Sequence, residues 1–207
     1  MNSDYESLMG LITARRSVRR FDDRPVERGD IERLVDAARW APSNHNRQGW
    51  KFVVFSDAAE LTALAGKVRQ SLTARLADCP GIPQNRADEL IEHATDFAAA
   101  PRVVLVMHKR ASLAAGELFA GNTLASGEAL SAAMATENML LAAASMELAA
   151  CVFTAPLLGR DVWEQIDDLP LGFDPTCLVA IGHPSGPVPE PPRKKRVEQI
   201  IEYRLGH

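Results

Sequence analysis

Four arginines and a serine stand close together near the start of the chain, in the run Arg15-Arg16-Ser17-Val18-Arg19-Arg20-Phe21. Each guanidinium is permanently charged and binds phosphate oxygens through paired donors, and a serine hydroxyl adds one more hydrogen bond. If the run is extended, alternate side chains share one side, so Arg15, Ser17 and Arg19 would face the same ligand. Arg16 and Arg20 would then face elsewhere. Taken alone, the run fits a solvated basic helix end better than a phosphate site.

A second basic cluster, Arg193-Lys194-Lys195-Arg196, lies near the other end of the chain. The chain as a whole is mildly acidic, with a formal net charge of −4 at pH 7. General nucleic-acid binding is therefore not suggested, because it depends on an excess of positive charge. Two basic clusters at opposite ends of an acidic chain instead favour one local anionic site where the ends meet.

A polar loop rich in side-chain amides separates a predicted helix from a predicted strand, and it reads Ala41-Pro42-Ser43-Asn44-His45-Asn46-Arg47-Gln48-Gly49-Trp50. So many donors and acceptors are costly to bury without partners. A solvated turn would satisfy them, and so would a loop that faces a ligand, since binding residues often stand on loops held by a rigid scaffold. The residue types alone leave both alternatives open.

Hydrophobic periodicity predicts the elements that position these segments. Helices are expected at residues 4–15, from 31 to a stop before Pro42, and at 58–77, 87–98 and 128–150. Strands are expected at 51–55, 103–107 and 176–181, with another beginning at 152, and the apolar run 103–107 suits a central strand. The helix 128–150 is rich in Ala and Met and carries Glu137 and Glu147. We therefore expect a buried helix at a subunit interface rather than a membrane span.

Two segments lack this periodicity. Residues 109–127 contain several glycines and are expected to form a mobile connection or a lid. Residues 182–192 contain five prolines and are expected to be extended. Such a tail has to lie either on its own body or on a partner, and the apolar residues of 197–203 could anchor its end.

The chain length of 207 residues and the 46% hydrophobic content suit one domain with a substantial core. The three cysteines are odd in number and widely spaced, which is typical of free thiols in a reducing compartment. The N-terminus is polar and acidic, unlike a signal peptide, so we expect a cytoplasmic protein. The sequence contains no Rossmann glycine fingerprint, Walker loop or nucleophile elbow, and its five histidines have no metal-ligand spacing.

Four segments, in their order and spacing, resemble the FMN-dependent nitroreductase family. They are 15–21, 41–52, 138–143 (Asn-Met-Leu-Leu-Ala-Ala) and 181–184 (Ile-Gly-His-Pro) followed by Arg193 and Lys195. The resemblance implies an α+β fold with a mixed central β-sheet wrapped by helices. It also implies an intertwined, obligate homodimer with two FMN sites at the interface. Residues 1–207 would form a single nitroreductase-like domain, with 182–207 as an extended C-terminal tail.

The resemblance also implies roles for the basic residues. Arg15, Arg16 and Ser17 would hold the phosphate and ribityl chain of FMN, and Arg19 would reach the N1/O2 edge of the flavin ring. Arg193 and Lys195 of the tail would close on the phosphate. A phosphate monoester carries about two negative charges near neutral pH, which matches this concentration of cations.

Two further segments would complete the site by the same resemblance. The amide-rich loop would contribute from the other subunit, through Pro42, Ser43, Asn44 and Asn46. The segment near flavin N5 would hold Thr154 and Ala155, although it lacks the glycine pairs common in the family. Gln48-Gly49-Trp50 stands where the family often has Gln-Pro-Trp, and Gln70 is a candidate for the O2/N3 edge of the ring.

The activity implied is hydride transfer from NAD(P)H through flavin N5 to a nitro, quinone or enal acceptor, by ping-pong kinetics. No catalytic side chain and no metal is required. The alternatives are a flavin-fragmenting or reductive dehalogenase enzyme of the same fold and, from another class, a non-enzymatic anion-binding module. The sequence leaves the physiological acceptor and the choice between NADH and NADPH open.

Overall fold

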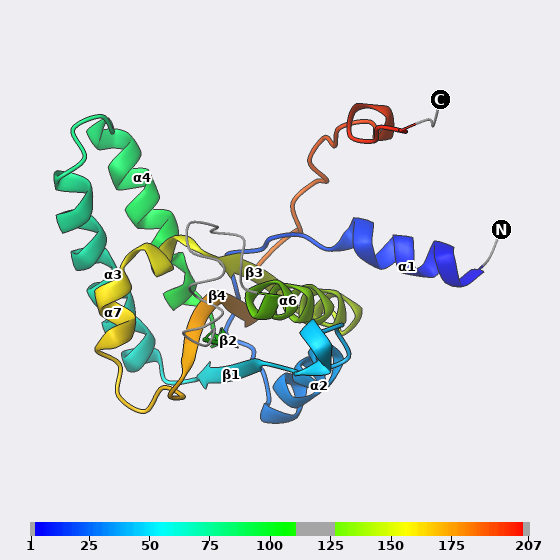
Figure 1. Cartoon of the computed structure of the whole chain (residues 1–207), viewed down its shortest axis with the longest axis horizontal. Helices are drawn as coiled ribbons and strands as arrows, with labels where there is room; N and C mark the ends of the chain where they lie inside the picture. The colour runs from blue at the N-terminus through cyan, green and yellow to red at the C-terminus, as the bar shows by residue number, and fades with distance from the viewer. Residues whose placement is uncertain (1–2, 111–126, 205–207) are drawn as a thin grey trace.

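The computed structural model describes residues 3–110 and 127–204. Its centre is an antiparallel sheet of four strands in the order β1-β2-β4-β3 (Figure 1). The strands are β1 (Trp50–Phe55), β2 (Arg102–Lys109), β3 (Ala149–Phe153) and β4 (Phe173–Gly182). β2 pairs with a strand on each side, which confirms the central position predicted for the run 103–107.

Helices cover both faces of this sheet (Figure 1). One layer contains α3 (Ala58–Ala77), α4 (Gln84–Thr95), the 3-10 turn η2 (Asp96–Ala99) and α7 (Arg160–Glu164), and the other contains α2 (Arg28–Ala38) and α6 (Gly127–Ser145). Successive residues of β2 point to opposite faces. Val103, Leu105 and Met107 therefore pack in the core under α3 and α4, whereas Val104 and Val106 pack in the core under α2 and α6.

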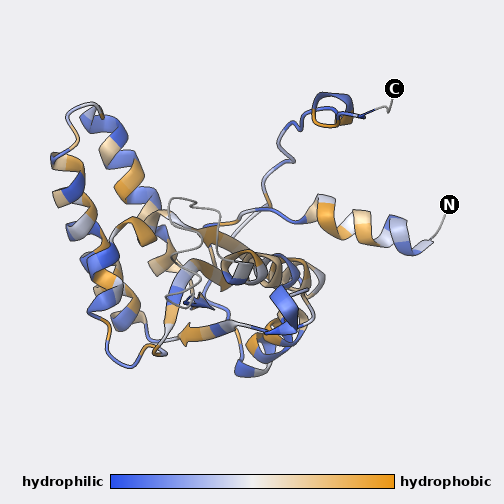
Figure 2. Cartoon of the chain, in the orientation of Figure 1, coloured by the Kyte–Doolittle hydropathy of each residue, from blue (hydrophilic) through white to orange (hydrophobic). Residues whose placement is uncertain are grey.

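The two ends of the chain extend away from the sheet toward the same side (Figure 1). They are α1 (Ser3–Ala14) and the tail, which ends in the 3-10 turn η4 (Val197–Gln199). α1 has apolar turns in Figure 2, and its Tyr5, Leu8 and Ile12 are exposed. The apolar residues of the tail end are exposed too, among them Ile200 at 67%. Among the described residues, the end of the tail is therefore not buried against its own body.

Helix α3 has the predicted bounds, and a capping residue precedes its first turn. The Asp57 side chain accepts a hydrogen bond from the Glu60 N–H at 2.8 Å, which satisfies a free donor of the first turn. α4 and η2 together occupy residues 84–99, close to the predicted 87–98.

Helix α6 ends earlier than predicted, at Ser145 rather than residue 150. Glu147 takes a positive φ of 57°, and the Leu148 N–H donates to the Ala143 carbonyl at 2.9 Å. These are the features of a Schellman helix end, which usually has glycine at the left-handed position. The prediction was wrong because a glutamate fills that position here. The released residues 149–153 form β3.

Strand β4 begins three residues earlier than predicted, at Phe173. Pro175 lies inside it, and proline is normally restricted to strand edges because it lacks an N–H donor. β3 pairs with β4 only from Leu178 to Gly182, so Pro175 meets a strand on one side alone. The pairing with β2 also shifts register beside Thr176.

The predicted lid, the membrane-spanning and metal-binding potential of the chain, and the state of its cysteines can be compared with the described residues. Most of the predicted lid, residues 111–126, lies outside the described residues. No helix within 3–110 or 127–204 is both long and apolar enough to cross a membrane. Within those ranges no group of three or more His, Cys, Asp or Glu side chains could hold a metal ion. All three cysteines are free, with Cys79 exposed and Cys151 and Cys177 buried.

Candidate functional site

The first basic run lies beside β3 as a short extended segment. Ser17 forms an isolated parallel bridge with Ala150, and the Val18 N–H donates to the Ala150 carbonyl at 3.2 Å. All pairs between named strands are antiparallel, so in the described chain this bridge supplies the parallel component of the predicted mixed sheet. The extended conformation that the predicted alternation requires is present at Ser17 and Val18.

The beginning of the tail closes over the same run. The Ser185 N–H donates to the Arg20 carbonyl at 3.2 Å, and Phe21 forms an antiparallel bridge with Pro184. Gly182 permits this approach, since a Cβ there would stand 2.6 Å from Phe21 Cδ1. The Gly182-His183-Pro184 sequence is thus the place where the two ends of the chain meet.

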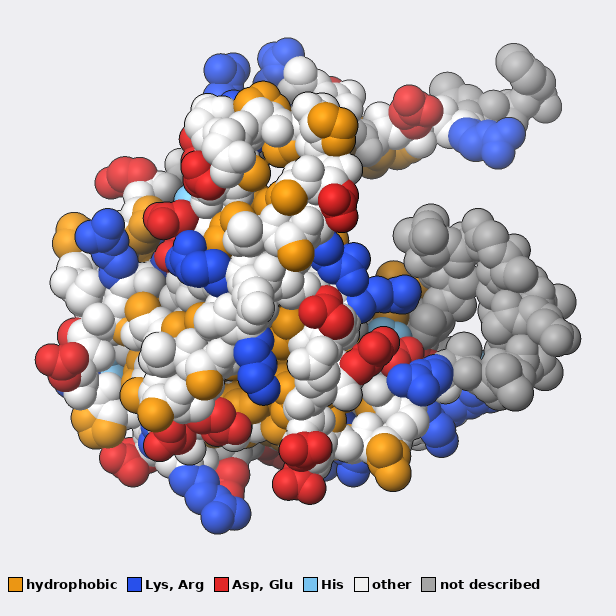
Figure 3. All heavy atoms as spheres, turned by 90° about the vertical axis from the view of Figure 1, so that its left-hand side faces the viewer, with side chains coloured by type: hydrophobic (Ala, Val, Ile, Leu, Met, Phe, Trp, Pro, Cys, Tyr) orange, Lys and Arg blue, Asp and Glu red, His pale blue; other side chains and the backbone are white. Residues whose placement is uncertain are grey.

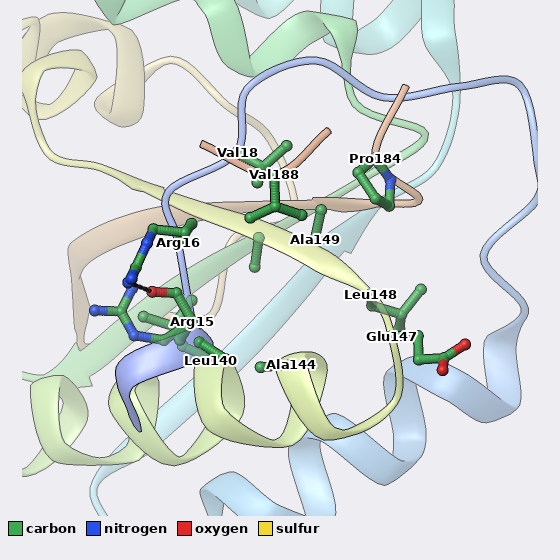
Figure 4. Close-up of a pocket in the computed structure, with 12 residues that line it drawn as sticks. Arg15, Arg16, Val18, Leu140, Ala144, Glu147, Leu148, Ala149, Pro184 and Val188 are labelled. Carbon is green, nitrogen blue, oxygen red and sulfur yellow. Dashed lines mark hydrogen bonds between the residues drawn. The ribbon is translucent and has the colours of Figure 1, made fainter. Parts of the chain in front are cut away.

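Arg15 and Arg16 line a cavity of about 310 Å³ between the basic run, the end of α6, β3 and the tail (Figure 4). Apolar side chains form much of the wall, including Leu140 of α6 and Val188 of the tail. Arg16 Nη1 donates to the Arg15 carbonyl at 2.6 Å, the contact drawn in Figure 4. The cavity therefore places two guanidiniums against an otherwise largely apolar surface.

The Arg15 guanidinium has unused hydrogen-bonding capacity. Its Nε lies 3.4 Å from Glu137 Oε1 of α6, within ion-pair distance, but it is buried and forms no hydrogen bond within the described residues. A buried donor without a partner is destabilising by about 1–3 kcal/mol, and more for a charged group. Such a donor suits an anionic oxygen supplied from outside the chain, with which Glu137 would compete.

Ser17, Arg19 and Arg20 line a second cavity of about 410 Å³, and residues 184–187 and Pro189 of the tail form its other wall. The predicted separation of alternate residues is therefore wrong for two of them. Arg16 lines the same cavity as Arg15, and Arg20 lines the same cavity as Ser17 and Arg19. Long arginine side chains can bend toward either side, which a simple alternation of Cβ directions does not capture.

A buried thiol lies under the alternate residues of the run. Burial raises the pKa of Cys151 above its ordinary value, whereas the positive charge of Arg19, a hydrogen bond with Ser17 and the charge of Arg15 oppose that rise. The Arg19 guanidinium carbon also lies 6.0 Å from the centre of the Phe153 ring. The Arg19 guanidinium thus lies beside the end of β3.

Thr154 and Ala155 follow directly after Phe153, at the end of β3. Thr154 is exposed, and its carbonyl accepts the Leu157 N–H at 3.0 Å. Ala155 is partly buried and begins the 3-10 turn η3 (Ala155–Leu158). These two residues therefore follow in sequence the ring that Arg19 contacts, although neither lines the two cavities.

Pro42, Ser43, Asn44 and Asn46 lie elsewhere, in the loop that holds the 3-10 turn η1 (Asn44–Asn46). The loop packs on the first turn of α6, where the Asn44 N–H donates to Ser131 Oγ at 3.0 Å. The cavity of Arg15 lies at the opposite end of the same helix. Within one chain, the loop and the basic run are not brought together.

The remaining candidates are also apart from the two cavities. Arg193 and Lys195 are exposed in the tail, and neither forms an ion pair within the described chain. Gln70 is exposed on α3. On the face that carries α3 and α4, basic and acidic side chains are intermixed rather than gathered (Figure 3). That face lacks the extended basic surface that nucleic-acid binding requires.

Sequence reasoning gave no supporting role to Glu137 or Val188, and it identified Pro184 and Asn138 only as parts of the family motifs. Glu137 pairs with Arg15, and Pro184 and Val188 of the tail help to enclose the cavities. Asn138 donates from Nδ2 to the Ala37 carbonyl at 3.3 Å and so ties α6 to α2. The one signal in the sequence was helical spacing, because Glu137, Leu140 and Ala144 share a face of α6.

Comparison with known proteins agrees with this architecture. The profile of the Nitroreductase family matches residues 12–183. A Streptococcus pyogenes serotype M6 protein named as an NAD(P)H nitroreductase is 28% identical over 212 residues, which cover 92% of this chain and 96% of that protein.

Solved structures agree in fold. A BluB-like flavoprotein from Clostridium difficile 630 gives a TM-score of 0.80 at 24% identity, over 96% of this chain and 99% of that one. A nitroreductase with bound FMN from Bacteroides fragilis gives 0.71 at 19% identity, over 99% and 100%. An iodotyrosine deiodinase bound to FMN and 3-iodo-L-tyrosine gives 0.68 at 22% identity, over 96% and 99%. The predicted α+β, nitroreductase-like fold is confirmed, and because the family profile spans most of the chain, this protein belongs to the nitroreductase family.

Proposed function

We propose that the protein is an FMN-dependent oxidoreductase, which takes hydride from NAD(P)H and passes it to a nitro, quinone or enal acceptor in a ping-pong cycle. The observation that carries this proposal is the buried Arg15 Nε, which has no hydrogen-bond partner among the described residues and belongs to a side chain that lines a cavity with Arg16. Among the ligands of its relatives, FMN offers the phosphate oxygens that such donors need. The family membership supports the same cofactor.

The residues of the basic run would divide the work of holding FMN. Arg15, Arg16 and Ser17 bind the phosphate and the ribityl chain through charged donors and a hydroxyl. Arg19 stands farther along β3, where its charge stabilises negative charge at the N1/O2 edge of the ring. Bound FMN supplies the hydride chemistry itself. Thr154 and Ala155 would line the region near N5, and no side chain needs to act as an acid or a base.

The other candidates require a second subunit. The loop of Ser43, Asn44 and Asn46 lies at the opposite end of α6 from the cavity of Arg15, so it suits the site of a partner. The same holds for Arg193 and Lys195, which lie in the exposed part of the tail, beyond its contacts with the basic run. The exposed apolar residues of α1 and the tail would be buried by a homodimer. Removal of residues 193–207 should therefore yield monomers in sedimentation or light scattering, and an unchanged dimer would contradict this role of the tail.

Absorbance spectroscopy tests the function directly. The purified protein should be yellow or should bind one added FMN per chain. It should then oxidise NADH or NADPH with a nitroarene or a quinone as the acceptor. A colourless protein that binds no added FMN would overturn the proposal. It would favour the non-enzymatic anion-binding module instead.

A reductive dehalogenase or a flavin-fragmenting enzyme is the second candidate. It is favoured by the similar fold of the iodotyrosine deiodinase and of the BluB-like flavoprotein. Release of iodide from an iodinated phenol, or loss of flavin absorbance under oxygen after reduction, would identify this class. Steady turnover of a nitroarene with the flavin spectrum intact would exclude both.

A further inference from the structure

The loop of Ser43 to Gln48 has a strained backbone. Three of its residues that carry side chains take positive φ, namely His45 at 50°, Asn46 at 52° and Gln48 at 50°. A non-glycine residue with a positive φ destabilises the fold by about 1–3 kcal/mol unless neighbouring groups compensate. Hydrogen bonds inside the loop, such as Gln48 N–H to Ser43 Oγ at 3.0 Å, are local and do not fix the loop to the protein body.

The first turn of α6 provides the external support. The Ser131 hydroxyl accepts the Asn44 N–H at 3.0 Å and itself donates to the Gly127 carbonyl at 2.6 Å. Glu128 Oε1 lies 3.6 Å from Arg47 Nη1. The same helical turn therefore contacts the loop at two places, through a hydroxyl and through a carboxylate.

Glu128 is an unusual group to find in this place. Its side chain is only 9% exposed, and Oε2 is buried with no hydrogen-bond partner in the part of the chain that the structure describes. An unpaired buried carboxylate oxygen is destabilising, and the dipole of the helix start offsets only part of that cost. Stability alone therefore does not explain a glutamate at position 128.

Gly49 is shaped to fit this carboxylate. A Cβ on residue 49 would overlap with Glu128 Oε2 and would stand 3.4 Å from Lys109 Cβ. The backbone at Gly49 is fixed by the Lys109 N–H, which donates to its carbonyl at 2.7 Å, so it cannot shift freely. Gly49 and Glu128 are thus a matched pair, one of which leaves the space that the other fills.

We propose that Glu128 is a positioning residue for the flavin-facing loop: its buried carboxylate holds Arg47 and packs on Gly49, and thereby presets Ser43, Asn44 and Asn46 before FMN arrives. This inference rests on the proposed function, in which that loop faces the flavin. The unpaired Oε2 lowers the stability of the fold, while the same carboxylate keeps the loop in its binding conformation. Preorganisation raises affinity because the ligand does not have to order the loop.

Glu128→Met tests this inference, because it keeps the length of the side chain and removes the unpaired charge. We expect the apoprotein to melt at the same or a higher temperature, while the FMN dissociation constant, measured by fluorescence quenching, rises about tenfold. Trypsin cleavage after Arg47, followed by mass spectrometry of the apoprotein, should become faster. Glu89→Met is the matched control, because Glu89 also pairs with an arginine, Arg86 at 2.9 Å, but is exposed on α4. Neither its FMN affinity nor its cleavage after Arg47 should change.

The matched pair gives a second and independent test. Gly49→Ala should weaken FMN binding about as much as Glu128→Met, because the new Cβ displaces the carboxylate. In a Glu128→Ala background, Gly49→Ala should add little, since the clash is gone, and this non-additivity identifies direct coupling.

Three outcomes would overturn the inference: an unchanged FMN dissociation constant in Glu128→Met, a fall in melting temperature that accounts for the weaker binding, or additive effects of Gly49→Ala and Glu128→Ala. Absence of FMN binding by the unsubstituted protein is a different result. It would overturn the proposed function, whereas faster cleavage after Arg47 in Glu128→Met would still show that Glu128 positions the loop.

Discussion

The basic run at residues 15–20 and the amide-rich loop at 43–48 are both ligand-facing segments in the proposed function, but they are held in opposite ways. Backbone pairing holds the basic run, between Ala150 of β3 on one side and Ser185 of the tail on the other. The loop has left-handed residues instead and depends on side chains of α6, Glu128 and Ser131. A segment that pairs through its backbone tolerates many side chains, whereas a loop supported by side chains depends on each of them.

The two segments should also contribute to ligand binding in different ways, the basic run through direct contacts and the loop through its order before binding. In the basic run the unsatisfied group is a donor, Arg15 Nε, which an anionic ligand would satisfy directly. Beside the loop, the group without a partner among the described residues is an acceptor of α6, Glu128 Oε2, and Glu128 lines neither of the two cavities. Substitutions in the first segment should therefore change ligand contacts, and substitutions around the second should change the order of the loop.

The largest effect is expected from Gly182→Ala, which breaks the pairing that holds the basic run. The new Cβ would meet Phe21 Cδ1 at 2.6 Å and Pro101 Cδ at 2.8 Å, in a packed region where neither can easily move. We expect a loss of about 2–3 kcal/mol in the free energy of unfolding, measured by urea denaturation. Gly66→Ala on α3 is the control, because nothing lies within 4 Å of its Cβ and alanine favours a helix. Equal stability of the two variants would show that the pairing is not tight.

Next in size is the loss of the unsatisfied donor itself. Arg15→Ala should raise the FMN dissociation constant by about 10–100-fold, because hydrogen bonds to charged groups contribute about 1.5–3 kcal/mol each. Its melting temperature should stay the same or rise, since the ion pair with the half-exposed Glu137 contributes little and the substitution removes a buried donor that has no hydrogen-bond partner among the described residues. Arg33→Ala, which removes an exposed ion pair with Asp30 on α2, is the control. A similar loss of affinity in that variant would remove the specific role of Arg15.

The two segments were also unequally predictable. The extended basic run and its neighbour Ile181-Gly182-His183-Pro184 could be located from residue types and order, because local chemistry and short-range pairing define them. The support of the loop could not, since Ser131 and Glu128 lie about 80 residues from it in sequence and look like ordinary polar residues of a helix start. Gly49 was visible as a departure from the usual Gln-Pro-Trp, but its partner was not.

The same distinction applies to the fold. Strand β2 followed from an apolar run and helix α3 from an apolar stripe at helical spacing, and both are local signals. The end of α6 did not, because Glu147 occupies a left-handed position where glycine is usual, and the neighbouring sheet compensates for it. The early start of β4 depends on the partial coverage by β3 that leaves Pro175 at an edge, and this is a property of the assembled sheet.

A smaller effect is expected from Ser131→Ala, which removes one side-chain support of the loop. The Asn44 N–H would lose its acceptor, at a cost of about 1 kcal/mol, and FMN binding should weaken about fivefold. Ser145→Ala is a close control, because Ser145 lies on the same helix and its hydroxyl also donates to a helix carbonyl, that of Ala142 at 2.8 Å. Calorimetric titration of both variants with FMN would compare them, and equal affinities would remove Ser131 from the support of the loop.

The smallest effect concerns the buried thiols beneath the two regions. Cys151 lies under the basic run, and Cys177 lies under α6, with Sγ 3.7 Å from Thr136 Oγ1. Burial raises the pKa of Cys177 from 9.0 to about 11, and burial also raises the pKa of Cys151, where Arg19 opposes the rise. Because each folded pKa lies above the unfolded value, both thiols contribute stability that is lost as the pH rises, for Cys177 between pH 9.0 and about 11. Melting temperatures from pH 8 to 11 should therefore fall less steeply in Cys177→Ala than in Cys151→Ala, since the cation beside Cys151 already limits its contribution. If the melting temperature instead fell less steeply with pH in Cys151→Ala than in Cys177→Ala, the charge of Arg19 would not be limiting the contribution of the Cys151 thiol.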